Sequence, residues 1–207
     1  MATVLFAFAH PDDETLAAGA AIAEHVDAGH DVHLLWMTRG ENSTVLDYLN
    51  GVGTSAWWGV VHDPAAEGYT PLDSVDIGVA RIAEATAAVR ILTSGLGTVT
   101  LHEGFLSDGG LHQVNAEAAI LAVTDEAAPG SAPVRLKGHT WLPQLDAHPD
   151  HIAVGAAIKA LAQADPARFG DRRHYLLPGY WSDPDLTLVA EAVAKVDSTR
   201  QLVRGKA

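Results

Sequence analysis

Short apolar runs alternate along this chain with longer, alanine-rich stretches of helical period, and this alternation constrains the fold more than any other feature. The first run, residues 4–9, is apolar at every position, as is typical of a strand covered on both faces. The next stretch, residues 12–28, has helical periodicity and is followed by Gly29, a common helix terminator. Further strands are expected at 32–38, 98–102, 134–141 and 174–177, and further helices at 75–92, 113–126, 152–164 and 186–203. This order predicts an α/β fold, in which a mostly parallel, doubly wound, Rossmann-like sheet forms the middle of three αβα layers.

Composition narrows the classes of protein that such a chain can belong to. With 207 residues, 48% of them apolar and 19% charged, we expect one folded domain over residues 1–207 and exclude a disordered chain. The net charge of −13 disfavours nucleic acid and anionic membrane surfaces as partners. No apolar run reaches the roughly 18 residues of a membrane span, and the first residues lack the basic flank of a secretion signal, so a cytoplasmic location is expected. These properties do not decide between a monomer and a homo-oligomer.

The absence of cysteine leaves histidine and carboxylates as the only strong metal ligands. In open parallel sheets, ligands bind beyond the carboxyl ends of the strands. The first candidate cluster, residues 10–14 (HPDDE), directly follows the first predicted strand, and Pro11 suits the first turn of a helix. His10 and one aspartate offer metal ligands, and the other aspartate is left to handle a proton. The alternative is an ordinary helix cap, since acidic residues are common at helix starts.

The second cluster, residues 148–151 (HPDH), also precedes a predicted helix. Both clusters would lie at one edge of the sheet, where together they offer a His/Asp/His zinc site with an open fourth position. Bound zinc would acidify water and polarise a carbonyl, and a free carboxylate and imidazole would transfer protons. Iron and manganese are alternatives, because these ligands select weakly among metals. A surface turn with incidental histidines is the alternative to any metal site.

Residues 9–14 (AHPDDE) and 148–151 (HPDH) resemble the two motifs of the LmbE/PIG-L family of zinc-dependent N-deacetylases. The resemblance implies one zinc ion per chain, held by His10, Asp13 and His151. It also implies that Asp12 is the general base and that His148 stabilises an oxyanion or acts as general acid. Asp150, between the two motif histidines, is expected to orient His148 by a hydrogen bond.

Two weaker matches concern the substrate. Residues 81–84 (RIAE) resemble a family helix whose arginine contacts the sugar, which implies this role for Arg81; the alternative is a solvated ion pair with Glu84. Asp108, before two glycines, resembles a sugar-binding aspartate; the alternative is a simple turn residue. The chain departs from the pattern at Asp146, where relatives acting on sugar–inositol substrates often carry a tyrosine. This departure removes a tyrosine from the expected oxyanion contacts.

The resemblance implies a zinc hydrolase that removes an acyl group, usually acetyl, from the amide nitrogen of an amino sugar or its conjugate. One alternative is an amidase for a larger conjugate, such as a thiol adduct or a glycopeptide. Another is a non-catalytic ligand-binding module, which is disfavoured because no glycine-rich phosphate loop follows the first strand. Trp57 and Trp58 either stack on a substrate ring or pack their long loop onto the core. His102 and His139 are expected to be core or supporting histidines.

Overall fold

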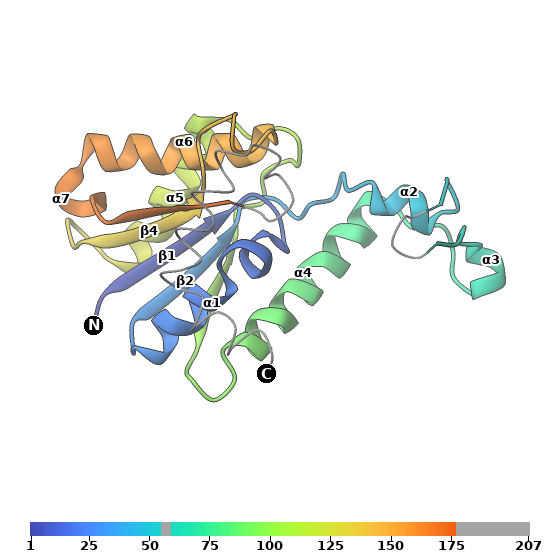
Figure 1. The fold of residues 1–207 in the computed structure, drawn as a ribbon, viewed down its shortest axis with the longest axis horizontal. Helices are drawn as coiled ribbons and strands as arrows, with labels where there is room; N and C mark the ends of the chain where they lie inside the picture. The colour runs from blue at the N-terminus through green and yellow to red at the C-terminus, as the bar shows by residue number, and fades with distance from the viewer. Residues whose placement is uncertain (55–58, 177–207) are drawn as a thin grey trace.

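The computed structural model describes residues 1–54 and 59–176, and within them five parallel strands form one sheet in the order β3-β2-β1-β4-β5 (Figure 1). The strands are β1 (Thr3–Phe8), β2 (Asp31–Trp36), β3 (Val99–Glu103), β4 (Val134–His139) and β5 (Arg172–Tyr175). The chain builds outward from β1 to β2 and β3, then returns to the other side of β1 with β4. The reversal of direction between β1 and β4 is the place where open α/β sheets bind ligands.

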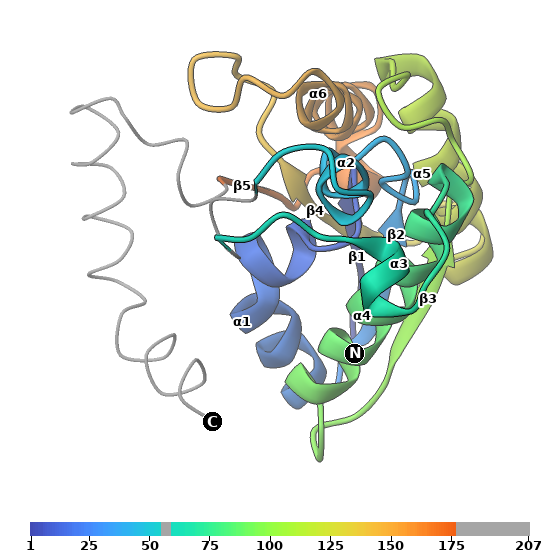
Figure 2. The same cartoon turned by 90° about the vertical axis from the view of Figure 1, so that its right-hand side faces the viewer.

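Helices cover both faces of this sheet (Figures 1 and 2). The helices of the described residues are α1 (Asp13–Asp27), α2 (Val45–Leu49), α3 (Pro64–Glu67), α4 (Ser74–Leu92), α5 (Gln113–Ala127), α6 (Pro149–Ala164) and α7 (Pro166–Phe169). Of these, α2 and α3 lie away from the sheet and do not cover its faces (Figure 1). The pair α1 and α4 packs on one face, and the pair α5 and α6 packs on the other. The predicted three-layer αβα fold with a parallel sheet is therefore confirmed.

The position of β1 in the middle of the sheet explains why its sequence is apolar without interruption. Val4, Phe6 and Phe8 pack among side chains of α1 and α4, whereas Leu5 and Ala7 pack in the separate cluster under α5 and α6. All five side chains are at most 1% exposed. Burial on both faces of the central strand requires an apolar residue at every position.

The structure differs from the expected elements mainly in the loops. The segment 39–73, expected to lack regular structure, contains the short helices α2 and α3. The side chain of Asp63 caps α3 by accepting hydrogen bonds from the N–H groups of Ala65 and Ala66. Helix α7, which was not expected, begins in the same way at Asp165 and Pro166. Trp57, Trp58 and the helix expected at 186–203 lie outside the described residues.

Two connections between strands and helices bring the residues of the candidate site together. The turn from β1 into α1 and the longer connection from β4 into α6 leave the carboxyl ends of adjacent strands at the same edge of the sheet. None of the helices in the two described ranges combines the length and the apolar character needed to cross a membrane.

Candidate metal centre and active site

Three predicted metal ligands meet where these two connections converge. His10 follows β1, Asp13 begins α1, and His151 lies in the first turn of α6. Their side chains are almost completely buried. The Nδ1 atom of His10 lies 3.2 Å from Nε2 of His151 and 3.4 Å from Oδ2 of Asp13, and the latter two atoms are 3.5 Å apart.

These separations suit one tetrahedral metal ion. Zinc bonds of about 2.0–2.1 Å at tetrahedral angles separate neighbouring ligand atoms by about 3.3–3.4 Å. Two imidazole nitrogens and one carboxylate oxygen also match the donor set of catalytic zinc sites. The residues present therefore fit a divalent ion held by His10, Asp13 and His151.

Each of the two imidazoles directs one nitrogen to this centre and the other to a carboxylate. Nδ1 of His151 lies 2.8 Å from Oδ2 of Asp146, and Nε2 of His10 lies 3.0 Å from Oδ1 of Asp108 and 3.4 Å from Oδ2 of Asp150. Such carboxylates fix the orientation and tautomer of metal-binding histidines. Asp146, which the sequence comparison treated only as a missing tyrosine, therefore supports His151.

The buried carboxylates give the centre a strong preference for positive charge. Burial alone lowers the pKa of His10, but hydrogen bonds to Asp108, Asp13 and Asp150 outweigh burial and raise it to about 11. Burial raises the pKa of Asp13, yet the charge of His139 and hydrogen bonds from His10 and His139 hold it well below its ordinary value. The negative potential that holds a proton on His10 also favours a divalent cation at its Nδ1.

His139, at the end of β4, is a further member of the site. Its Nε2 lies 3.1 Å from Oδ2 of Asp13, and its ring stacks on that of His151 with 4.0 Å between centroids and 4° between planes. The ring is fully buried and supports two predicted ligands at once. His102, the other histidine considered from the sequence, instead pairs with His33 at 2.9 Å on strands β2 and β3.

Asp12 does not act as the ordinary helix cap that the sequence left open. It occupies the N-cap position of α1, but its side chain accepts no capping hydrogen bond, and its φ is 119°. Its carboxylate, 57% exposed, accepts a hydrogen bond of 2.9 Å from Nη2 of Arg81. Partial burial raises the pKa of Asp12, the guanidinium of Arg81 opposes this shift, and the neighbouring carboxylates add to it. A carboxylate with a raised pKa beside a metal centre suits proton transfer.

His148 lies directly beside the ligand histidines, with its ring stacked on that of His151 at 4.4 Å. Its Nδ1 accepts a hydrogen bond from the backbone N–H of Asp150 at 3.2 Å, so a neutral ring carries its proton on Nε2. Burial, followed by the charges of His151 and His10, lowers the pKa of His148. A neutral imidazole with Nε2–H is suited to donate a hydrogen bond to an oxyanion.

The carboxylate of Asp150 has a different role from the one expected. We predicted that it orients His148, but the structure assigns that contact to the backbone N–H of Asp150. The carboxylate accepts hydrogen bonds from the N–H groups of Gly109 at 2.7 Å and Leu111 at 3.1 Å, and it contacts His10. It therefore ties the loop after β3 to the metal centre.

Arg81 and Asp108, predicted to bind substrate, both lie at the rim of the centre. Arg81 reaches from α4 and donates to the backbone carbonyls of Pro11 at 2.8 Å and Gly40 at 2.9 Å, in addition to Asp12. Asp108 contacts His10 through Oδ1 and accepts from the N–H of Asn42 through Oδ2 at 2.9 Å. Their substrate contacts stay a prediction, since both side chains already hold the framework of the site.

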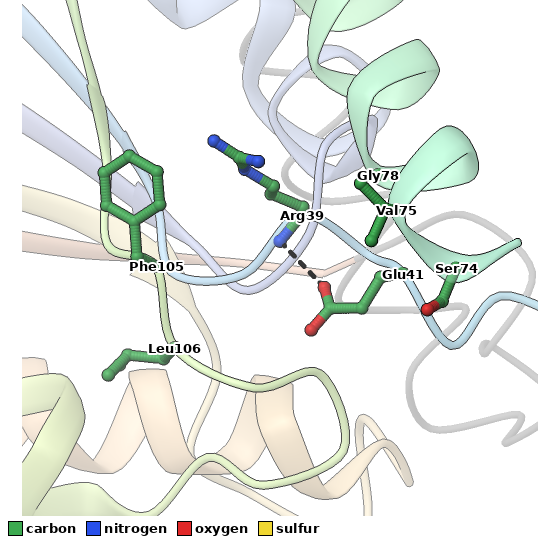
Figure 3. Close-up of a pocket in the computed structure, with 7 residues that line it drawn as sticks. All are labelled: Arg39, Glu41, Ser74, Val75, Gly78, Phe105 and Leu106. Carbon is green, nitrogen blue, oxygen red and sulfur yellow. Dashed lines mark hydrogen bonds between the residues drawn. The ribbon is translucent and has the colours of Figure 1, made fainter.

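A hollow of about 210 Å³ adjoins this rim between the start of α4 and the loop after β3 (Figure 3). Glu41 lies in its wall and accepts a hydrogen bond of 3.0 Å from the N–H of Asp108, which links the hollow to the metal centre. On the other side, the guanidinium of Arg39 lies 4.9 Å from the ring centre of Phe105. The lining is mostly apolar, with an exposed Phe105 and Val75.

This chain is similar in sequence to a known protein family and to curated proteins. Residues 5–162 match the family described as PIG-L, GlcNAc-PI de-N-acetylase. The chain is 32% identical over 177 residues to the 1D-myo-inositol 2-acetamido-2-deoxy-alpha-D-glucopyranoside deacetylase of Rhodococcus jostii. It is 33% identical over 171 residues to the protein of the same name from Rhodococcus erythropolis. Each match covers 78% of this chain and 53% of the relative, so the chain spans about half the length of these relatives.

Solved structures share the fold at lower identity. N,N'-diacetylchitobiose deacetylase from Pyrococcus horikoshii aligns with 96% of this chain and 70% of that chain, with a TM-score of 0.59 and 18% identity. GalB, the 4-carboxy-2-hydroxymuconate hydratase from Pseudomonas putida KT2440, aligns with 84% of this chain and 62% of that chain, with a TM-score of 0.55 and 21% identity. Because a hydratase and a deacetylase have this fold, the fold alone does not decide the reaction.

Proposed function

The chain belongs to the PIG-L family, and from this membership and the geometry of the site we propose that it is a metal-dependent N-deacetylase. The reaction is hydrolysis of the amide bond between an acyl group, typically acetyl, and the nitrogen of an amino sugar or amino-sugar conjugate. The observation that carries this proposal is the set of three ligand atoms from His10, Asp13 and His151 at mutual separations of 3.2–3.5 Å. This set leaves Asp12 and His148 available: Asp12 precedes Asp13 in the chain, and the ring of His148 stacks on that of His151.

We infer that the three ligands hold one zinc ion per chain. When bound, a divalent cation supplies Lewis acidity, which polarises an amide carbonyl and acidifies water. The carboxylates of Asp146, Asp108 and Asp150 keep the two ligand imidazoles correctly oriented for it.

The remaining chemistry falls to side chains of this chain. Asp12 accepts a proton from water as the water oxygen bonds to the amide carbonyl carbon. The Nε2–H of His148 donates a hydrogen bond to the carbonyl oxygen as negative charge develops there, and His148 keeps its proton. When the carbon–nitrogen bond breaks, Asp12 returns its proton to the departing nitrogen, so that the products are a free amine and a carboxylic acid. Arg81 orients the Asp12 carboxylate for both transfers.

The curated relatives are named for an acetamido sugar joined to inositol, which makes an N-acetylated amino sugar the first substrate to test. The hollow beside Glu41 and Phe105 favours a second candidate, a conjugate whose apolar group extends past the sugar. Rates on N-acetylglucosamine and on its aryl and alkyl glycosides distinguish the two substrate classes. The conjugate class requires a higher kcat/KM for the glycosides, and equal values would favour the simple sugar.

The decisive experiment measures amine release from a panel of N-acetylated sugars and glycosides, with and without a chelator. We expect release that is abolished by chelation and restored by zinc, with about one bound ion per chain. A folded protein that binds one ion but releases amine from none of these compounds would contradict the deacetylase function. It would not contradict the proposed metal site. A folded protein that binds no divalent ion would refute the metal centre itself.

A further inference from the structure

Glu14 is a buried carboxylate that neither the proposed metal binding nor the proposed proton transfers use. It follows Asp13 in the first turn of α1 and is 0% exposed. Among the described residues, three groups donate hydrogen bonds to it: the indole Nε1–H of Trp36 at 2.8 Å, the backbone N–H of Asp12 at 3.1 Å and the hydroxyl of Thr15 at 2.7 Å. A carboxylate is kept in such a place only where hydrogen bonds offset the loss of water.

The contact with Asp12 holds an unusual backbone conformation. Asp12 has φ 119° and ψ −32°, a region that residues with a Cβ rarely adopt. Such conformations persist only where the surroundings fix them, and they cluster at functional sites. Here the N–H of Asp12 binds Glu14, and its carbonyl accepts from the N–H groups of Thr15 and Leu16. The peptide groups on both sides of Asp12 are thereby fixed.

This conformation separates two adjacent aspartates. The Asp13 carboxylate faces inward to His10 and His139, whereas the Asp12 carboxylate faces the rim and meets Arg81. An N-cap aspartate with extended backbone angles would instead direct its carboxylate to the N–H groups of the first turn. The backbone angles of Asp12 therefore decide whether its carboxylate is available to water or consumed as a helix cap.

We propose that Glu14 is the positioning residue for Asp12, with Trp36 as its anchor. Oε2 of Glu14 accepts from both Trp36 and Asp12, so the rigid indole at the end of β2 fixes the oxygen that fixes the Asp12 backbone. Trp36 is 1% exposed and belongs to the core under α1 and α4. The position of the Asp12 backbone is therefore fixed by contacts that lead to the central sheet, and not only by the end of α1. The catalytic consequence rests on the proposed function, whereas the backbone consequence does not.

The test substitutes Glu14→Met, which keeps the length of the side chain but removes both carboxylate oxygens. Glu14→Gln would not remove the contact, because its amide oxygen can still accept from Trp36 and Asp12 while its NH2 group donates to the hydroxyl of Thr15. We expect kcat for deacetylation to fall about 10- to 100-fold, with KM within about 2-fold and metal content unchanged. In the Asp12→Ala background, Glu14→Met should have no further effect on kcat, because it acts only through Asp12. Thr15→Val is the matched control, since it removes only the hydrogen bond to the other oxygen, Oε1, and kcat should stay within about 3-fold of wild type.

A second readout does not depend on activity. In ¹⁵N-labelled protein, Glu14→Met should shift the indole N–H resonance of Trp36 and accelerate hydrogen exchange of the Asp12 amide by at least about 10-fold, whereas Thr15→Val should leave both unchanged. Unchanged exchange at Asp12 in Glu14→Met would overturn the proposal, even in a protein without deacetylase activity. A further loss of kcat in the Asp12→Ala background, or a loss of bound metal, would also overturn it, because Glu14 would then support the site as a whole.

Discussion

Nε2 of His151 lies 3.2 Å from Nδ1 of His10, although 141 positions separate the two residues in the chain. Parallel pairing of β1 with β4 brings them together, with Ala7 opposite Gly138 near the ends of the two strands. His10 lies in the turn that carries the chain from β1 into α1, and His151 lies in the first turn of α6, just after the connection from β4. A metal centre built in this way depends on the register of two central strands and on the two connections that follow them.

Metal binding and turnover should be separable by substitution. His151→Ala removes one of three ligands, so we expect loss of the bound ion together with loss of activity. Asp12→Ala keeps all three ligands, so metal content should remain near wild type while kcat falls about 10²- to 10⁴-fold. Elemental analysis of the dialysed proteins and amine-release rates provide the two measurements. Near-full activity of Asp12→Ala would show that the base has been assigned to the wrong residue.

Asp146 should affect the affinity for metal and not the stabilisation of the oxyanion. Its Oδ2 holds Nδ1 of His151 at 2.8 Å, and its Oδ1 accepts from the N–H of His148 at 2.9 Å. We expect Asp146→Asn to weaken zinc binding about 10- to 100-fold, as measured by competition with a chelating dye. At saturating zinc, most of the activity should return. Wild-type zinc affinity in Asp146→Asn would mean that another group orients His151.

Arg81 should set the acidic limb of the pH–rate profile. Its guanidinium lowers the pKa of Asp12, which burial and neighbouring carboxylates raise, so Arg81→Gln removes the opposing influence and the pKa rises further. A general base must be deprotonated, so the acidic limb of kcat/KM should move to higher pH. Arg90→Gln is the control, because it removes the same charge from α4 about 13 Å further along the helix. An equal shift in both variants would attribute the effect to net charge.

Gly155 should be required for the close packing of α6. A Cβ at this position would collide with the backbone of Thr140, which cannot move without displacing the end of β4. We expect Gly155→Ala to lower the free energy of unfolding by about 1–3 kcal/mol in urea titrations. Gly19→Ala in α1 is the matched control: its Cβ would lie 3.3 Å from a flexible leucine methyl group, and helix propensity favours alanine by about 1 kcal/mol. Equal effects in the two variants would contradict the packing explanation.

His25, which lies outside the candidate site, should make the free energy of unfolding depend on pH. Burial and then the charge of Lys137 lower its pKa to about 4, from 6.5 in a model peptide. Between these values the unfolded chain binds more protons at this position than the folded protein does, so stability falls as pH falls from about 6.5 to 4. For a partly exposed ring we expect a contribution on the order of 1 kcal/mol. Urea unfolding across this pH range should show a flatter dependence for His25→Gln than for wild type, and an identical slope would exclude His25 as its source.

Much of the fold and the ligand-bearing turns could be predicted because the signals are local. The uninterrupted apolar run of β1 follows from burial on both faces. Pro149 begins α6, as suits a proline, whereas Pro11 lies just before the N-cap residue of α1 and not in its first turn. The expected ligands His10, Asp13 and His151 lie at the entries to these two helices, which is why their convergence could be expected from strand order. The short helices α2, α3 and α7 were not expected, because an element of four or five residues is too short to show a helical period; α3 and α7 are each capped by an aspartate, whereas α2 is not.

The sequence by itself determined which chemical groups this chain can bring to a site, and that parallel strands would carry them to one edge. Only the tertiary structure decided their partners: Asp146 against His151, Asp108 and Asp150 against His10, His139 against Asp13, and Glu14 beneath Asp12. Periodicity reports which face of an element is buried, since burial repeats with the backbone. It does not report hydrogen bonds between side chains far apart in the chain, because these depend on distances that are fixed only when the layers pack.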